Sequence, residues 1–183
     1  MTSFSCALGG LLVLASGLCH SALISSGSAE IRGTFQFDFE SAVEGGLSPT
    51  ADVWWEQMTS TTRQLAAASG NSAALIALGV VPFASISEVD LMGYAYSSAA
   101  IEGPPSGSLL NVGGVFAVRT TEGNFAKAIV TGYDTGIAGF GFYDIQIRYE
   151  LYGNRSTVPE PGSWALALGA LLLLATTTRR SRS

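Results

Sequence analysis

Carboxyl groups are the side chains of this sequence that lie close enough together to suggest acid–base chemistry. Two pairs have suitable spacing, Asp38 with Glu40 and Asp52 with Glu56. A glycosidase needs two carboxyl groups roughly 5–10 Å apart, one of them with a raised pKa. Residues 38 and 40, however, also alternate as the solvated face of any strand does. We therefore expect no catalytic carboxylate.

The other residue types restrict metal and nucleophile chemistry. The stretch Asp134-Thr-Gly136 is too short for a calcium loop, which needs clustered Asp and Asn residues with Gly. Both cysteines (Cys6 and Cys19) and the only histidine (His20) lie near the beginning of the chain. The remainder therefore has no Cys nucleophile, no His base and no Cys/His zinc site. We expect a non-enzymatic protein without metal or cofactor.

Two adjacent tryptophans, Trp54 and Trp55, are the residues best suited to stack on a ligand. Neighbouring strand residues point to opposite faces, so at most one of the two belongs to a given core face. The other could stack on a sugar ring or be covered by a loop or neighbouring layer, because tryptophans are highly buried on average. The sequence leaves both possibilities open.

Charge excludes one class of partner. Residues 23–157 carry thirteen Asp and Glu against six Lys and Arg, a net charge of about −7. The basic residues are scattered, so no stripe can follow a phosphate backbone, and we expect no nucleic-acid partner. Arg119 and Lys127 flank a predicted hairpin loop near Glu122, where we expect an ordinary surface charge network.

The end of the chain combines three unlike parts. The first consists of Val158, Pro159, Glu160, Pro161, Gly162 and Ser163. An apolar run from Trp164 to Ala175 follows, and the basic end contains Arg179, Arg180 and Arg182. The prolines fix φ and lack a backbone donor, so the first part is expected to be extended. A helix over 164–178 would span about 22 Å, short of the roughly 30 Å hydrocarbon core of a bilayer.

A Pro-Glu-Pro element, a short hydrophobic segment and a terminal arginine cluster, in that order, resemble the PEP-CTERM sorting signal. In that family, the signal is recognised and processed by an exosortase, a membrane-embedded cysteine protease/transpeptidase of Gram-negative bacteria. The resemblance covers residues 158–183 and implies export, a transient membrane contact and a destination in the cell envelope or extracellular matrix. The alternative is a plain membrane anchor that is never cut, with Trp164 at one interface and the arginines on the cytoplasmic side.

The beginning of the chain is also typical of a targeting segment. Phe4–Leu18 is an apolar stretch of signal-peptide length, followed by small residues, so cleavage is expected near Ser21 or Ala22. Its length argues against a retained membrane anchor. We therefore divide the chain into a signal peptide (1–22), one domain (23–157) and a sorting signal (158–183).

Alternating apolar and polar residues predict an all-β domain. Strands are expected at 31–40, 51–58, 73–81, 91–96, 112–120, 125–133 and 144–152, with a hairpin loop at 121–124. Helix is expected only at 61–68 and for one turn after Ser87, where Ser87 and Asp90 have capping-box spacing. Short strands with frequent turn signals indicate an antiparallel β-sandwich or jelly-roll-like single domain, flanked by an N-terminal signal helix and a C-terminal hydrophobic helix.

These observations favour an exported structural or binding protein of the cell surface or exopolysaccharide matrix. The alternative is a secreted carbohydrate-binding module or carbohydrate-active enzyme that uses a surface tryptophan and nearby carboxylates.

Overall fold

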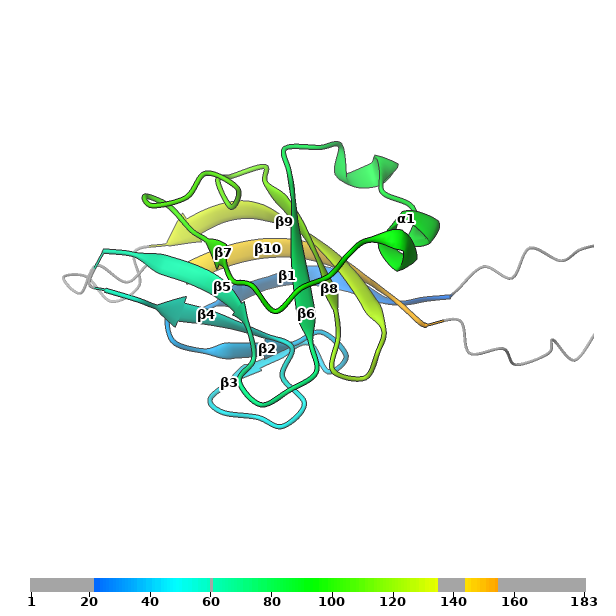
Figure 1. Ribbon diagram of the computed structural model, residues 1–183, viewed down its shortest axis with the longest axis horizontal. Helices are drawn as coiled ribbons and strands as arrows, with labels where there is room; N and C mark the ends of the chain where they lie inside the picture. Colours follow the sequence, from blue (N-terminus) through cyan, green and yellow to red (C-terminus); the bar gives the residue numbers. More distant parts are fainter. Residues whose placement is uncertain (1–21, 60, 135–143, 155–183) are drawn as a thin grey trace, which may run out of the picture.

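The chain folds into a single all-β sandwich of two antiparallel sheets, which confirms the predicted fold class (Figure 1). The computed structural model describes residues 22–59, 61–134 and 144–154. Sheet A contains, in spatial order, β1 (Leu23–Ile31), β10 (Asp144–Tyr152), β9 (Phe125–Asp134), β8 (Val115–Arg119) and β6 (Ala74–Gly79). Sheet B contains β3 (Val43–Gly45), β2 (Gln36–Asp38), β4 (Val53–Gln57), β5 (Arg63–Ala67) and β7 (Ile101–Glu102).

The core lies between the two sheets and follows the period-two pattern of the strands. On β10, the residues Ile145, Ile147, Tyr149 and Leu151 are all buried, as their alternation predicts. Phe37 and Phe39 meet Tyr149 edge to face, with ring centroids 5.8 and 5.4 Å apart. These aromatic contacts join sheet B to sheet A.

The predicted hairpin at 112–133 is confirmed, with a later start than expected. Strands β8 and β9 pair antiparallel from Val115 opposite Ile129 to Arg119 opposite Phe125. At the tip, Thr120 N–H donates to Asn124 O over 2.9 Å, and Gly123 has a φ of 85° that favours glycine. Glu122 lies in this tip, between β8 and β9.

The single strand predicted at 31–40 is wrong. The chain leaves sheet A at Ile31, turns through 32–35 and enters sheet B as β2. Thr34 has a φ of 73° at this turn, and Asp144 Oδ1 accepts from Gly33 N–H over 2.9 Å. The strand β1, at 23–31, was not predicted because its serines and glycine hide the alternation.

The helix predicted at 61–68 is also wrong, since β5 occupies this stretch. Arg63 and Leu65 are buried on one face, and Leu65 lies opposite Trp55 of β4. The turn before β5 is fixed by Thr59 Oγ1, which accepts from the N–H groups of Thr61 and Thr62 over 3.2 and 3.1 Å. Cross-strand packing outweighs the helical preference of the alanines here.

The strand predicted at 91–96 is replaced by a helix that the capping box starts. Ser87 Oγ accepts from Asp90 N–H, and the Asp90 carboxylate accepts from Ser87 N–H, ahead of α1 (Glu88–Gly93). Together with the 3₁₀ turn η1 (Phe83–Ser85), α1 covers the outer face of sheet A. Phe83, Ile86 and Leu91 bury themselves there against Val115 and Ala117.

Lys127 is buried beneath this cover, so the expected surface charge network at this residue is wrong. Its Nζ donates to Phe83 O and Ile86 O over 3.2 and 2.9 Å and pairs with Glu150 at 3.0 Å. Its side chain is 4% exposed. The lysine therefore fastens residues 83–86 to β9, whereas Arg119 is exposed.

The described residues contain no helix that is long and apolar enough to cross a membrane. Residues 1–21 of the predicted signal peptide (1–22) and the whole predicted hydrophobic helix (164–178) lie outside the described residues.

Candidate functional site

The two tryptophans point to opposite faces of sheet B, as alternation requires. Trp55 is fully buried in the core, where its ring lies 6.1 Å from that of Tyr133. Trp54 lies on the outer face of the sheet and is partly exposed. Its strand neighbours in register are Gln36 and Ala66. Trp54 is therefore the one of the two that a ligand can reach.

The outer face of sheet B around Trp54 is mostly polar. Glu56 and Gln64 lie opposite each other and form a hydrogen bond of 2.5 Å, with Gln64 Nε2 as donor. Gln36 is covered by the loop at 46–50, where Ser48 N–H donates to its Oε1 over 3.0 Å. The face thus combines one aromatic surface with amide and carboxylate groups. These are the group types that orient a polar ligand such as a sugar.

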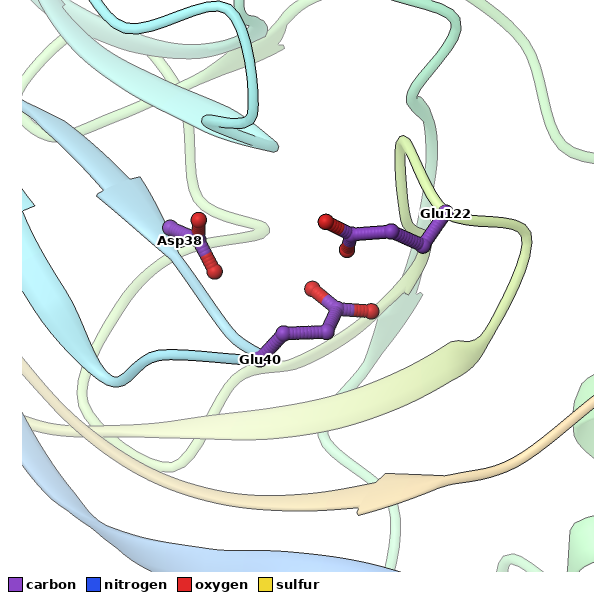
Figure 2. A group of neighbouring side chains, drawn as sticks. All are labelled: Asp38, Glu40 and Glu122. Carbon is purple, nitrogen blue, oxygen red and sulfur yellow. The ribbon is translucent and has the colours of Figure 1, made fainter.

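Three carboxyl groups meet at one end of this face. Oxygen atoms of Asp38, Glu40 and Glu122 all lie within 4.8 Å of one another. Figure 2 shows the three groups pointing toward a common centre, with Asp38 and Glu40 from one stretch of chain and Glu122 from the hairpin tip opposite. We call these three residues the carboxylate cluster.

Hydrogen bonds hold two members of the carboxylate cluster in place. Glu40 Oε1 accepts from Thr120 Oγ1 over 2.6 Å and from Asn124 Nδ2 over 3.1 Å. Asp38 Oδ1 accepts from Ser41 N–H over 2.9 Å. Glu40 is therefore tied to the hairpin tip that carries the exposed Glu122.

Asp52 anchors the same hairpin tip through hydrogen bonds to the backbone. It is fully buried, and its two oxygens accept from Phe39 N–H over 2.9 Å and Thr121 N–H over 2.7 Å. Both donors are backbone groups, so Asp52 bridges the end of β2 to the β8–β9 tip. This contact brings residues more than eighty positions apart into one cluster.

Like charge and burial raise two pKa values in this region. The pKa of Glu122 is raised to about 7, chiefly because its carboxyl shares a hydrogen bond with Glu40 and then by burial and by the charges of Glu40 and Asp38. Burial raises the pKa of Asp52 to about 7, against the two backbone donors that lower it. The crowding of Glu122 against Glu40 and Asp38 therefore favours the protonated form of the Glu122 carboxyl.

The structure brings one of the two candidate carboxylate pairs together and separates the other. Asp38 and Glu40 do lie together, joined by Glu122, which the sequence did not single out as an acidic partner. Asp52 and Glu56 are four residues apart on an extended strand, about 13 Å by strand geometry, and Glu56 bonds Gln64 instead. The sequence predicted that Glu122 lies at a hairpin tip, but it gave no indication that this tip packs beside Asp38 and Glu40.

The cluster is the one group of side chains in the described residues whose types and spacing suit a metal ion. Calcium takes six to eight oxygen ligands, and Glu40 Oε1 is already occupied by two donors. Asp134 lies exposed at the end of β9, and the rest of the short stretch considered for calcium lies outside the described residues.

The predicted sorting residues (Val158–Ser163, Trp164, Arg179, Arg180 and Arg182) also lie outside the described residues. The structure does show where the chain approaches them. Strand β10 ends beside the start of β1, with Tyr152 opposite Leu23 and Gly153 N–H bonded to Ala22 O over 3.1 Å. Asn154 N–H then bonds Asn124 Oδ1 over 2.9 Å. Both ends of the described domain are therefore side by side (Figure 1).

Comparison with protein-family models, with curated proteins and with solved structures found no match to this chain.

Proposed function

We propose that this protein is exported and sorted, through an exosortase-type membrane protease, to the cell surface or exopolysaccharide matrix of a Gram-negative bacterium. It acts there as a structural or binding component and not as an enzyme. The observation that carries the proposal is the order of Pro-Glu-Pro, apolar run and arginine cluster after a compact β-domain. The absence of Cys and His from residues 23–157 agrees with a domain held together by packing and hydrogen bonding alone.

The position of Asn154 supports access of a protease to the motif. Four residues separate Asn154 from Pro159, a reach of at most about 17 Å for an extended chain of five steps. Because the prolines disfavour helix, the motif would be presented as extended backbone close to one end of the sandwich. Extended backbone is the form that a protease cleft binds.

Replacement of Pro159, Glu160 and Pro161 by alanine tests the sorting proposal. The mutant should be exported normally but remain in the membrane fraction, whereas the wild type is released. The matched control replaces the neighbouring Arg155, Ser156 and Thr157 by alanine and should be released like wild type. Equal membrane retention of wild type and mutant in an exosortase-bearing host would show that the tail is a simple anchor.

A second candidate function, carbohydrate binding, is favoured by the partly exposed Trp54 on the polar outer face of sheet B. An indole ring beside amide and carboxylate groups offers stacking to a sugar ring and hydrogen bonds to its hydroxyls. The acidic surroundings favour a neutral or cationic glycan over an anionic one.

A glycan array with the exported protein tests this candidate. Trp54→Ala should abolish binding to any glycan that the wild type retains, with little change in the thermal midpoint. Tyr94→Ala removes a partly exposed aromatic residue from the opposite side of the sandwich and should leave glycan binding intact. Binding that survives Trp54→Ala, or no binding to any glycan, would remove sheet B as a carbohydrate surface.

A further inference from the structure

The sandwich has four edge strands, and three of them offer little backbone for pairing. Strands β3 and β7 have only three and two residues. Strand β6 is partly closed, because Leu75 exchanges hydrogen bonds of 2.8 and 3.0 Å with Ser97. Strand β1 differs, with nine residues at the edge of sheet A. Within the described ranges, no backbone hydrogen bond joins β1 to any strand other than β10.

The registers identify the backbone groups that β1 leaves free. In an antiparallel ladder, residues bonded to one neighbour alternate with residues whose N–H and C=O point the other way. The N–H and C=O groups of Leu75 point away from β8, toward Ser97. When this alternation is followed through the registers of sheet A, the N–H and C=O groups of Gly27 and Ala29 point toward β10. The N–H and C=O groups that point outward then belong to Ser26, Ser28 and Glu30.

Side chains along this edge do not obstruct a second strand. Natural edge strands are usually protected by proline, lysine, bulges or covering loops. Between Ser25 and Ala29, β1 has none of these and carries only small residues, with Ser26 and Ser28 exposed. Its irregularity lies at Leu23–Ser25 and its single charge at Glu30, so both are confined to the ends of the strand.

We propose that β1 pairs antiparallel with β1 of a second copy of this chain, which joins two A sheets into one continuous sheet. A twofold axis matches each outward N–H of one copy to an outward C=O of the other, because the two edges are identical. Charge also allows the pairing. A register centred on Gly27 or Ser28 places Glu30 opposite Ile24 or Ser26 of the second copy, so like charges do not face each other.

The resulting dimer presents two copies of the outer face of sheet B. Each copy keeps its own Trp54, on sheet B, and its own carboxylate cluster, between the end of β2 and the β8–β9 tip, since neither includes a residue of β1. An edge-to-edge contact buries less surface than a standard interface, so the dimer forms at roughly micromolar to millimolar concentration. Attachment to a repeating polymer at two points would strengthen such a pair by avidity.

Sedimentation velocity of the exported protein over a range of concentrations tests the dimer. Ser28→Pro removes an outward N–H without removing a bond to β10, and should weaken dimerisation by roughly tenfold or more because two symmetry-related hydrogen bonds are lost. The matched control Ser28→Ala keeps the N–H and should dimerise like wild type. If Ser28→Pro lowers the thermal midpoint, Ser28→Glu replaces it, because residue 28 lies opposite or diagonal to its own counterpart in either register and like charges would then meet.

Amide hydrogen exchange locates the contact. The N–H groups of Ser26, Ser28 and Glu30 should become protected as the concentration rises, while those of Gly27 and Ala29 are protected at every concentration. A wild type that stays monomeric at about millimolar concentration would overturn the proposal. So would a dimer that leaves the amides of Ser26 and Ser28 unprotected, or one that neither Ser28→Pro nor Ser28→Glu weakens.

Discussion

The two outer faces of the sandwich are treated in opposite ways. On sheet A, residues 80–97 cover the outer face and bury Phe83, Ile86 and Leu91 against it. On sheet B, the loop at 46–50 covers Gln36, and Trp54 stays partly exposed among polar side chains. The covered face therefore contributes to stability, whereas the outer face of sheet B remains accessible to a partner.

Charge follows the same division. The covered face contains a buried lysine whose ammonium group is satisfied by two carbonyl oxygens and a carboxylate. The open face ends in three carboxyl groups, and their crowding raises the pKa of Glu122. Removal of a buried cation leaves its partners unpaired and destabilises the fold, whereas crowded carboxyl groups make stability depend on pH.

The largest effect is expected from Lys127→Met. The variant keeps most of the apolar stem but removes the ammonium donor from the carbonyl groups of Phe83 and Ile86 and the cation from Glu150, which keeps the Tyr152 hydroxyl as a donor. We expect the free energy of unfolding to fall by about 2–4 kcal/mol, measured by urea denaturation. Amide exchange should also accelerate in residues 83–93, where the cover is attached.

Arg148→Met is the matched control for this prediction. Arg148 is exposed, and its guanidinium lies 4.9 Å from the Phe83 ring, so it touches the cover without fastening it. Its loss should cost less than about 1 kcal/mol. Equal effects of the two substitutions would mean that the buried lysine does not hold the cover.

A smaller effect is expected from pH at the carboxylate cluster. The pKa values of Glu122 and Asp52 are about 7 in the folded chain, against ordinary values of 4.5 and 3.8. The folded state therefore binds more protons between these limits. Stability from these groups is fully present below the ordinary pKa values and is lost as the pH rises through about 7. The thermal midpoint should accordingly be higher at about pH 5 than at about pH 8.

Glu122→Gln isolates the contribution of the cluster. At about pH 8, the substitution removes a repelled charge and should raise the unfolding free energy by less than about 1 kcal/mol, because solvent screens this exposed group. At about pH 5, the carboxyl is already protonated and little should change. Glu102→Gln, an exposed residue of β7, should show no such pH dependence. A midpoint that rises with pH in the wild type would refute the assignment.

Metal removal should have no effect. Glu40 Oε1 already accepts from two donors, and three carboxyl groups fall short of the six to eight oxygen ligands that calcium takes, so chelator and millimolar calcium should both leave the thermal midpoint unchanged. A rise with calcium that Glu40→Gln removes would instead identify the carboxylate cluster as a cation site.

The sequence predicted the parts of the fold that local alternation determines. Strand β10 and the β8–β9 hairpin have clear period-two patterns, and both were found at or near the expected residues. The stretch 61–68 was misread because alanines suit a helix, while its pairing with β4 is a long-range contact. Strand β1 was not predicted because its small polar residues give no alternating hydrophobic pattern.

The candidate site was predictable only in part. Asp38 with Glu40 could be named, and alternation separated Trp54 from Trp55. Glu122 joins the cluster only because the buried Asp52 fixes the hairpin tip against the end of β2, a contact between distant segments. Likewise, the burial of Lys127 depends on a cover that begins more than forty residues earlier in the chain.

The position of β10 has a mechanical consequence. This strand is the last element before Asn154 and is paired along its length with β1 on one side and β9 on the other. Interstrand hydrogen bonds lie perpendicular to the strands, so tension between Asn154 and the opposite end of the sandwich pulls along β10 and loads both ladders in shear. Many bonds then share the force at once instead of opening one after another. A domain held by its C-terminal segment would therefore resist extension far better than one pulled across its sheets.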